Sequence, residues 1–196
     1  LFLVDNDAPG LTLRKLDMLG RRCTGTYEIF WDEVRVPGER LVGGENQGWD
    51  VVLSGLQVER VTSTAGYIGG MQAILDLAVD YAKERKQFGR PIGDFQGVQF
   101  QLAGMRTELE AARLLVYNAA RLKEANRPFL GEAAMAKLFA SEAAQRIAST
   151  CLDLHGGYGF SKEYPVEKLY RDAKIGTIYE GTSNMQKQTI AKLMLR

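Results

Sequence analysis

The sequence predicts a mainly α-helical fold, in which a β-rich first segment precedes a helical domain of the four-helix-bundle type. Two features of the residue pattern support this fold class. Before about residue 47, β-branched and aromatic residues alternate with polar ones, as in half-buried strands. From about residue 48, apolar residues recur at spacings of three and four, which is the period of an α-helix. We therefore expect two domains, the β-rich residues 1–47 and the helical residues 48–196.

The composition is typical of an intracellular globular protein. The chain has 196 residues, 45% of them hydrophobic, and its 25 basic and 24 acidic residues leave a net charge of +1. This balance gives no reason to expect nucleic acid or an anionic membrane as a partner, and no apolar run reaches the roughly 20 residues that span a bilayer. Cys23 and Cys151 are too few for a disulfide framework, and a single histidine, His155, rules out a histidine-cluster metal site.

The strand signals lie in residues 1–46. Tyr27, Ile29 and Trp31 alternate along one face of a predicted strand, and residues 34–36 form a second, short one. The chain opens on apolar residues 1–4, which we expect to be a strand already under way. Because it begins without an initiator methionine or a targeting pattern, we expect a fragment of a longer chain.

A first long helix is expected over residues 48–85. Its buried stripe repeats every three or four residues and comprises Ala65, Ile68, Met71, Leu75, Ala78 and Ala82. Gly89 and Pro91 follow a basic segment, which is typical of a helix that ends near Arg85.

Two further long helices are expected over residues 97–126 and 131–154. The inward positions of the first of them alternate spacings of four and three, as in the seam of an antiparallel bundle: Val98, Leu102, Met105, Leu109, Ala112, Val116 and Ala119. The inward face of the second is rich in small residues, which predicts tight packing: Ala136, Ala140, Ala143, Ile147 and Cys151. Gly156 and Gly157 come directly after a helix, so they are not a dinucleotide fingerprint, which follows a strand.

A short helix over residues 166–173 leads to a segment that ends at Glu180. Ile175, Ile178 and Tyr179 make the approach to this carboxylate apolar, and apolar surroundings raise the pKa of a carboxyl group. A general base that works near neutral pH requires such a shift.

Gly181 follows and would allow a ligand to come close to the backbone. The residues alone also fit a solvated turn followed by a helix N-cap at Thr182 or Ser183. The last helix, over residues 184–196, places Met185, Ile190, Leu193 and Met194 on one amphipathic face.

Three ordered blocks of this sequence resemble the acyl-CoA dehydrogenase family. They are Arg85-Lys86-Gln87-Phe88-Gly89 followed by Phe95-Gln96, then Leu154-His155-Gly156-Gly157-Tyr158-Gly159-Phe160, and finally Arg171-Asp172-Ala173-Lys174-Ile175 followed by Ile178-Tyr179-Glu180-Gly181-Thr182-Ser183. The resemblance implies that residues 1–47 are the C-terminal portion of a middle β-domain. Family members are roughly twice as long, which implies a missing N-terminal helical domain and half of the β-domain.

The resemblance also implies an enzyme that desaturates an acyl-CoA thioester between its α and β carbons, as in fatty acid metabolism or branched-chain amino acid degradation. Glu180 would remove the α-proton while the β-hydride passes to N5 of FAD. The Glu180 backbone N–H and a flavin hydroxyl would hold the enolate oxygen. Residues 109–115 and 173–177 are similar to the short/branched-chain members, which implies a short or branched acyl group. An electron-transfer flavoprotein would then accept the electrons.

A second glutamate, Glu59, is an alternative base. From the residues alone, Glu59 and Arg60 fit an exposed, salt-bridging pair on a helix. In a subset of relatives, however, the base lies at the position of Glu59. We favour Glu180, because relatives with the base at the position of Glu59 usually lack a glutamate at the position of Glu180. The resemblance implies substrate binding by Gln57, Val58, Glu59, Arg60 and Gly181.

The cofactor-binding residues that the resemblance implies come from all three blocks. Arg85 would pair with the FAD diphosphate, and its planar guanidinium suits that group. The remaining residues are Gln87, Phe88, Gln96, Asp153, Leu154, His155, Gly156, Gly157, Thr182, Ser183 and Asn184. Residues 153–157 would meet the FAD of a neighbouring subunit, which implies a homo-oligomer built as a dimer of dimers. The N-terminus of the last helix suits a flavin oxygen or a phosphate.

Two other functions remain open at this stage. An acyl-CoA oxidase or a flavin monooxygenase would keep the fold but let O₂ reach the reduced flavin. A non-catalytic helical interaction subunit, or an inactive fragment, would bind no FAD. The expected location is the cytoplasm of a bacterium or the mitochondrial matrix of a eukaryote.

Overall fold

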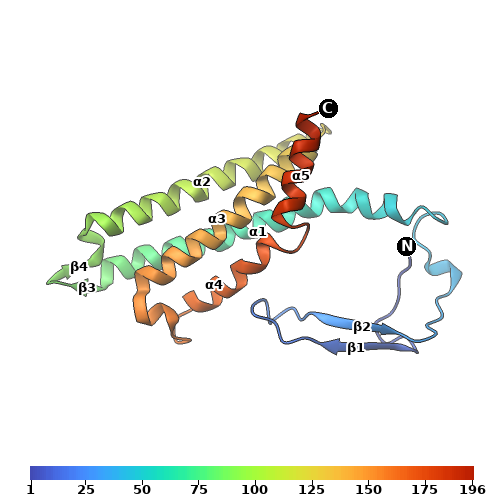
Figure 1. The fold of residues 1–196 in the computed structure, drawn as a ribbon, viewed down its shortest axis with the longest axis horizontal. Helices are drawn as coiled ribbons and strands as arrows, with labels where there is room; N and C mark the ends of the chain where they lie inside the picture. Colours follow the sequence, from blue (N-terminus) through green and yellow to red (C-terminus); the bar gives the residue numbers. More distant parts are fainter. The chain divides into compact units, whose positions relative to one another are not determined.

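The computed structural model describes all residues from 1 to 196, and these form two compact units, residues 1–58 and 59–196. Helices dominate the second unit, so the prediction of a mainly α-helical fold is confirmed (Figure 1). The predicted domain boundary at residues 47 and 48 coincides with the start of the first long helix and stays a prediction. No helix combines the length and the apolar character that crossing a membrane requires.

The first unit contains a two-stranded antiparallel ribbon. Strand β1 (Leu11–Lys15) pairs with β2 (Tyr27–Trp31), with Leu11 opposite Trp31 and Lys15 opposite Tyr27. All five side chains of β2 are exposed, because a two-stranded ribbon has no second layer to cover either face. The apolar face that the alternation predicted is therefore present in the sequence pattern but is not buried within this unit.

Two predicted strands of this unit are wrong. Residues 34–36 are irregular, and residues 1–4 form only a single bridge, between Phe2 and Leu41. Leu1 and Leu3 exchange backbone hydrogen bonds with Val42 and Arg40, but this pairing does not extend into a ladder. Leu41 itself follows a short 3₁₀ turn, η1 (Gly38–Arg40).

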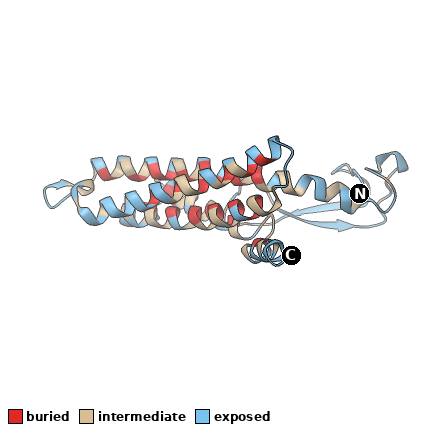
Figure 2. Ribbon diagram, turned by 90° about the horizontal axis from the view of Figure 1, so that it is seen from above, coloured by how far each residue is buried: buried red, intermediate tan, exposed pale blue.

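Three long helices form the body of the second unit, and the first of them begins within the first unit. They are α1 (Gly48–Glu84), α2 (Gln96–Glu124) and α3 (Leu130–His155), close to the predicted ranges. Their buried residues lie on the faces that they turn toward one another (Figure 2). The predicted inward positions of α3 are all buried, but Ala65 of the predicted α1 stripe is exposed. Thr64 is buried in its place, and its hydroxyl donates to the carbonyl oxygen of Arg60.

The alanine-rich helix α3 is the central element of this unit. It packs against α2, against α4 (Val166–Lys174) and α5 (Ser183–Met194), and against two 3₁₀ turns, η3 (Gly156–Phe160) and η4 (Ile175–Thr177). Small side chains allow several backbones to come close to one helix. The tight packing that the composition of α3 predicted is therefore confirmed.

A short hairpin that was not predicted joins α1 to α2. Strand β3 (Lys86–Gln87) pairs with β4 (Arg90–Pro91), and a 3₁₀ turn, η2 (Ile92–Asp94), follows. Phe88 and Gly89 form its tip with φ values of 52° and 79°, as in the type I′ turns that suit two-residue hairpins. The residues expected to end the helix thus also reverse the chain.

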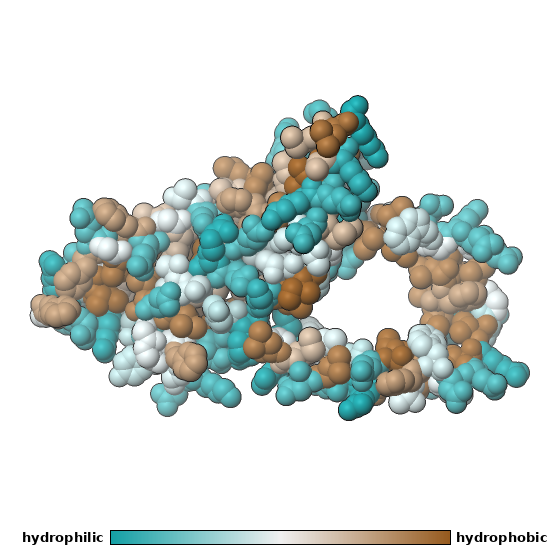
Figure 3. Space-filling view, in the orientation of Figure 1, coloured by the Kyte–Doolittle hydropathy of each residue, from teal (hydrophilic) through white to brown (hydrophobic).

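The predicted apolar face of α5 is not a buried face. Met185, Leu193 and Met194 are exposed, and Gln186 is the only fully buried residue of this helix. Apolar surface is visible over α5 in the space-filling view (Figure 3). The helix packs against α3, and Leu193 lies against the backbone of Gly131 there.

Candidate active site

Glu180 lies in a turn with an unusual backbone between η4 and α5. Glu180 and Gly181 have φ values of 56° and 82°, and a positive φ is unfavourable for a residue with a side chain. Three hydrogen bonds hold this turn. The amide Nε2 of Gln186 donates to the carbonyl oxygens of Glu180 and Gly181, at 3.1 and 2.9 Å, and the Nζ of Lys137 donates to the carbonyl oxygen of Gly181 at 2.7 Å. Thr182 is the N-cap of α5, and its hydroxyl accepts from the N–H of Met185 at 3.3 Å.

The carboxylate of Glu180 lies against α1. The hydroxyl of Ser63 can donate to its Oε2, at 3.2 Å, or to the backbone carbonyl oxygen of Glu59, at 2.7 Å. The side chain of Glu59 is close enough to interact electrostatically with that of Glu180. The fold therefore brings both candidate bases together, although Glu59 is exposed and Glu180 is partly buried.

The pKa of Glu180 is raised above the ordinary value of a glutamate. Burial is the largest cause, and repulsion from Glu59 adds to it, while the Ser63 hydroxyl and the charge of Lys137 act in the opposite direction. The direction agrees with the expectation from the apolar approach of residues 175–179. A carboxylate with a raised pKa is a stronger base than an ordinary glutamate. Its catalytic role stays a prediction.

Sequence reasoning missed Lys137, Ser63 and Gln186. Lys137 is completely buried in α3, and burial lowers its pKa, while the charge of Glu180 acts against that shift. The signal that could have found it is a lysine on the inward, alanine-rich face of a helix, where a charge needs a partner. Gln186 likewise lies among the apolar positions of α5.

A second candidate site is a cavity of about 580 Å³ at the opposite end of α1 from its start. Six of the predicted cofactor-binding residues line it: Arg85, Gln87, Leu154, His155, Gly156 and Gly157. The other lining residues are Tyr81, Ile92, Tyr158, Ser161 and Glu163.

Aromatic stacking fixes the walls of this cavity. The rings of Tyr81 and His155 stack with centroids 4.0 Å apart, and the guanidinium carbon of Arg85 lies 5.4 Å from the centroid of the Tyr158 ring. The Nδ1 of His155 lies 2.8 Å from the carbonyl oxygen of Cys151, which fixes the imidazole against α3. The charged groups of the cavity wall are the guanidinium of Arg85 and the carboxylate of Glu163.

The other predicted cofactor residues do not line this cavity. Phe88 is 93% exposed at the hairpin tip, and Gln96 and Asp153 are also exposed. Thr182, Ser183 and Asn184 belong to the start of α5, beside Glu180. The Ser183 hydroxyl there is buried without a hydrogen-bond partner, as is the Oε1 of Gln186. The roles of all these residues stay predictions.

The predicted substrate-binding residues divide between the two compact units. Glu59, Arg60 and Gly181 belong to the second unit, with Glu180. Gln57 and Val58 are half-buried residues of the first unit, on α1, and their role stays a prediction.

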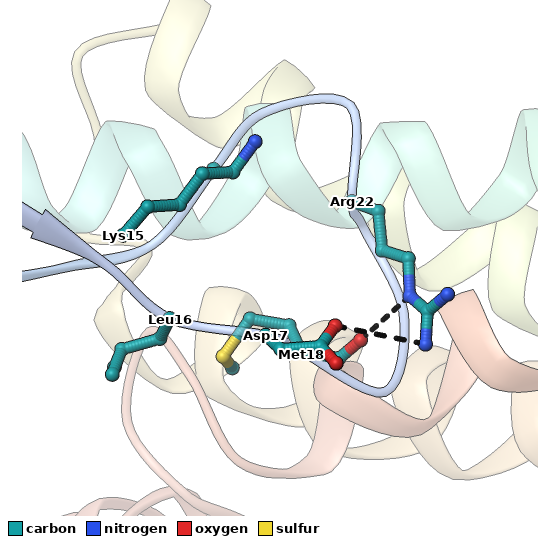
Figure 4. Close-up of a pocket in the computed structure, with 6 residues that line it drawn as sticks. Lys15, Leu16, Asp17, Met18 and Arg22 are labelled. Carbon is teal, nitrogen blue, oxygen red and sulfur yellow. Dashed lines mark hydrogen bonds and ion pairs between the residues drawn. The ribbon is translucent and has the colours of Figure 1, made fainter.

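The first unit has a small pocket of its own, of about 320 Å³, which the sequence did not indicate. It is lined by Lys15, Leu16, Asp17, Met18, Arg22 and Gly25 (Figure 4). Arg22 closes the loop by donating from Nε to the carbonyl oxygen of Met18 at 2.8 Å, and its guanidinium also pairs with Asp17 at 3.8 Å. These contacts of Arg22 hold the loop closed, so the shape of the pocket follows from the loop itself.

The fold and the turn of Glu180 and Gly181, named the base turn after the role predicted for Glu180, define a class of protein. Residues 46–195 match the acyl-CoA dehydrogenase C-terminal domain family, and the chain belongs to this family. The resemblance that the three sequence blocks indicated is thereby confirmed.

Among its relatives, the short/branched chain specific acyl-CoA dehydrogenase of mitochondria from Bos taurus is 51% identical over 192 residues, which cover 97% of this chain and 44% of that protein. The CarC subunit of the caffeyl-CoA reductase–Etf complex of Acetobacterium woodii is 43% identical over 196 residues, 100% of this chain and 52% of that protein. The structure of butyryl-CoA dehydrogenase from Megasphaera elsdenii superposes with a TM-score of 0.94 at 40% identity and covers 100% of this chain and 51% of the other. This chain therefore spans about half the length of the relatives that it matches.

Proposed function

We propose that the full-length protein that contains this chain oxidises a short or branched acyl-CoA thioester to its α,β-unsaturated product, with Glu180 as the base. The observation that supports this most is the placement of Glu180. Its carboxylate is partly buried, its pKa is raised by burial, and a strained turn held by three hydrogen bonds carries it. The similarity to short/branched chain and butyryl-CoA dehydrogenases supports the substrate class.

In this proposal the residues around Glu180 hold and move one proton. The carboxylate takes the α-proton of the thioester, and the raised pKa makes it a stronger base than an ordinary surface glutamate. Ser63 orients the carboxylate through Oε2, at 3.2 Å. The backbone N–H of Glu180 then stabilises the negative charge that develops on the thioester oxygen.

We propose FAD as the cofactor, which accepts the β-hydrogen with two electrons when it is bound. Two features of the structure fit this group. The cavity at Arg85 offers a guanidinium to a diphosphate, and no atom lies within 4 Å of a Cβ built on Gly156 or Gly157, so there is space against their backbone. The unpartnered Ser183 hydroxyl at the start of α5 offers a donor beside Glu180.

The partners follow from the same proposal. The two groups of cofactor residues lie in different parts of the helical unit, which supports a homo-oligomer in which one subunit completes the cofactor site of another. We propose an electron-transfer flavoprotein as the electron acceptor, since one relative is named as part of a complex with such a protein.

The decisive experiment compares Glu180→Gln with Glu59→Gln in the full-length, FAD-loaded protein. The readouts are exchange of the α-protons of butyryl-CoA with D₂O, followed by NMR, and anaerobic bleaching of the flavin. We expect Glu180→Gln to lower both rates by about 10²- to 10⁴-fold, the range for loss of a general base, with FAD still bound. If Glu59→Gln abolishes exchange and Glu180→Gln does not, Glu59 is the base. Rapid reoxidation of the bleached flavin in air would identify an oxidase.

A further inference from the structure

The buried ammonium of Lys137 is the least expected charge in the helical unit. Its side chain is completely buried, and its Nζ lies 2.7 Å from the carbonyl oxygen of Gly181. An ion removed from water is costly unless charges and hydrogen bonds compensate it. The charged groups that act on it are Glu180 from the base turn, Arg60 from α1 and Glu142 from its own helix.

Lys137 and Gln186 hold the same short stretch of backbone from two helices. Gln186 reaches the carbonyl oxygens of Glu180 and Gly181 from α5, and Lys137 reaches that of Gly181 from α3. Glu180 has a positive φ, which is costly for a residue with a side chain, so its conformation depends on these contacts, whereas Gly181 adopts its positive φ readily. The two donors explain why the buried residues at these points of α3 and α5 are polar.

A neutral donor would be enough if the only task were to satisfy a carbonyl oxygen. Gln186 already supplies one to Gly181, at 2.9 Å. Lys137 adds a positive charge in a poorly solvated place, where its interaction with the Glu180 carboxylate is weakly screened. The negative charge of Glu59 acts in the opposite direction and raises the pKa of Glu180.

We propose that Lys137 is a positioning residue for the base: its hydrogen bond to Gly181 fixes the turn that carries Glu180, and its charge favours the ionised carboxylate. This inference rests on the proposed function, in which Glu180 removes the α-proton. Lys137 touches neither the substrate nor the reacting atoms in this scheme. It acts through the backbone of Gly181 and through the field at Glu180.

The test uses Lys137→Met and Lys137→Gln in the full-length, FAD-loaded protein. Methionine removes the donor and the charge while it fills the space, and glutamine removes the charge but keeps a donor. Gln186→Met removes the neutral donor to the same turn, and Ser141→Ala is the control, a buried position on α3 whose hydroxyl bonds only to the carbonyl of Leu138. The readouts are α-proton exchange of butyryl-CoA in D₂O, kcat and KM against pH, FAD content and the thermal unfolding temperature.

We expect Lys137→Met to lower the exchange rate and kcat at neutral pH by roughly 10²-fold, because a base displaced by about an ångström loses rate on that order. KM should change little. On the acid side of the pH profile, kcat rises as Glu180 ionises; this part of the profile is the acid limb. In both Lys137 variants the acid limb should move to higher pH, since the charge that favoured the carboxylate is gone. Gln186→Met should lower kcat without moving that limb, and Ser141→Ala should match the wild type.

The outcomes separate this inference from the function on which it rests. If Glu180→Gln still exchanges α-protons, the proposed function fails. If Glu180→Gln is inactive while both Lys137 variants keep the wild-type acid limb, the inference about Lys137 is wrong and the function stands. If neither Lys137 variant retains FAD and the wild-type unfolding temperature, Lys137 is needed for folding, which also counts against the positioning role.

Discussion

The hydroxyl of Ser63 lies 3.2 Å from Oε2 of Glu180 and so connects α1 to a turn far along the chain. The same hydroxyl lies 2.7 Å from the backbone carbonyl oxygen of Glu59. A serine has a single proton to donate. A carboxylate is a stronger acceptor than a backbone carbonyl, so ionisation of Glu180 should draw that proton toward Oε2. Ser63 is therefore placed to stabilise the charged form of the proposed base.

Replacing Ser63 by alanine should raise the pH that the reaction requires. The hydrogen bond from Ser63 lowers the pKa of Glu180, so its loss should raise that pKa further and move the acid limb of kcat to higher pH. At high pH the rate should recover to within about tenfold of the wild type, since the base itself remains. The measurement is kcat against pH with butyryl-CoA. An acid limb that moves to lower pH would contradict the assignment of this contact.

Replacing Glu59 by glutamine should have the opposite effect on the same limb. Repulsion from Glu59 raises the pKa of Glu180, so a neutral side chain should lower it and move the acid limb to lower pH. Thr62→Ala is a suitable control, because Thr62 is an exposed residue of the same helix, carries no charge and donates its hydroxyl to the backbone of Glu59. If Glu59→Gln instead lowers the rate at every pH by 10²-fold or more, Glu59 is the base.

Local periodicity predicted the helices well and the polar contacts between them not at all. The spacing of Met105, Leu109 and Ala112 predicts which face of α2 is buried, because residues three and four apart lie on the same face of a helix. The contacts of Lys137 and Gln186 with the base turn are individual hydrogen bonds, each made by one side chain. No repeat in the sequence marks them, and they depend on how the helices are placed.

The errors have a common physical cause, which is that burial depends on a partner. Met185 and Met194 of α5 follow an amphipathic period, yet they remain exposed because no other element of the helical unit covers them. Tyr27 and Trp31 are exposed on a ribbon for the same reason. A periodic apolar pattern predicts which face is suited to burial, whereas the residue that covers it comes from elsewhere.

Replacing Arg85 by methionine should weaken the retention of FAD. Arg85 lines the cavity that we propose for the cofactor diphosphate, and a charge-assisted hydrogen bond contributes about 1.5–3 kcal/mol, which corresponds to roughly 10- to 150-fold in affinity. The adjacent Lys86→Met is the matched control, since Lys86 is exposed and does not line the cavity. FAD content after dialysis and the dissociation constant by fluorescence give the comparison. Equal losses in both variants would indicate a non-specific effect of charge.

The two cysteines should differ strongly in reactivity. Cys151 is completely buried, and burial raises the pKa of its thiol to about 12, whereas Cys23 is exposed. At pH 8 a thiol with a pKa of about 12 is ionised in roughly one molecule in 10⁴, and only the thiolate reacts. Iodoacetamide should therefore alkylate Cys23 in the native protein and spare Cys151, as peptide mass spectrometry can measure. Both should react in denaturant, and native labelling of Cys151 would mean that the core opens.

Replacing Glu180 by glutamine should stabilise the folded protein at neutral pH. The folded state raises the pKa of this carboxyl group above its value in the unfolded chain. The stability that Glu180 contributes is therefore fully present below the unfolded pKa, about 4.3, and is lost as the pH rises through the folded pKa. Glutamine resembles the protonated form and does not ionise, so it avoids that loss.

The difference in unfolding free energy between Glu180→Gln and the wild type should thus be positive at pH 7.5 and should shrink toward pH 4. Urea unfolding at the two pH values measures it, provided that the FAD content of the two proteins is equal at each pH. A wild type that is the more stable protein at pH 7.5 would show that the turn favours the charged carboxylate. A catalytic base kept in a place that disfavours its charge is expected to cost stability, because the same burial that makes it a strong base penalises its ionised form.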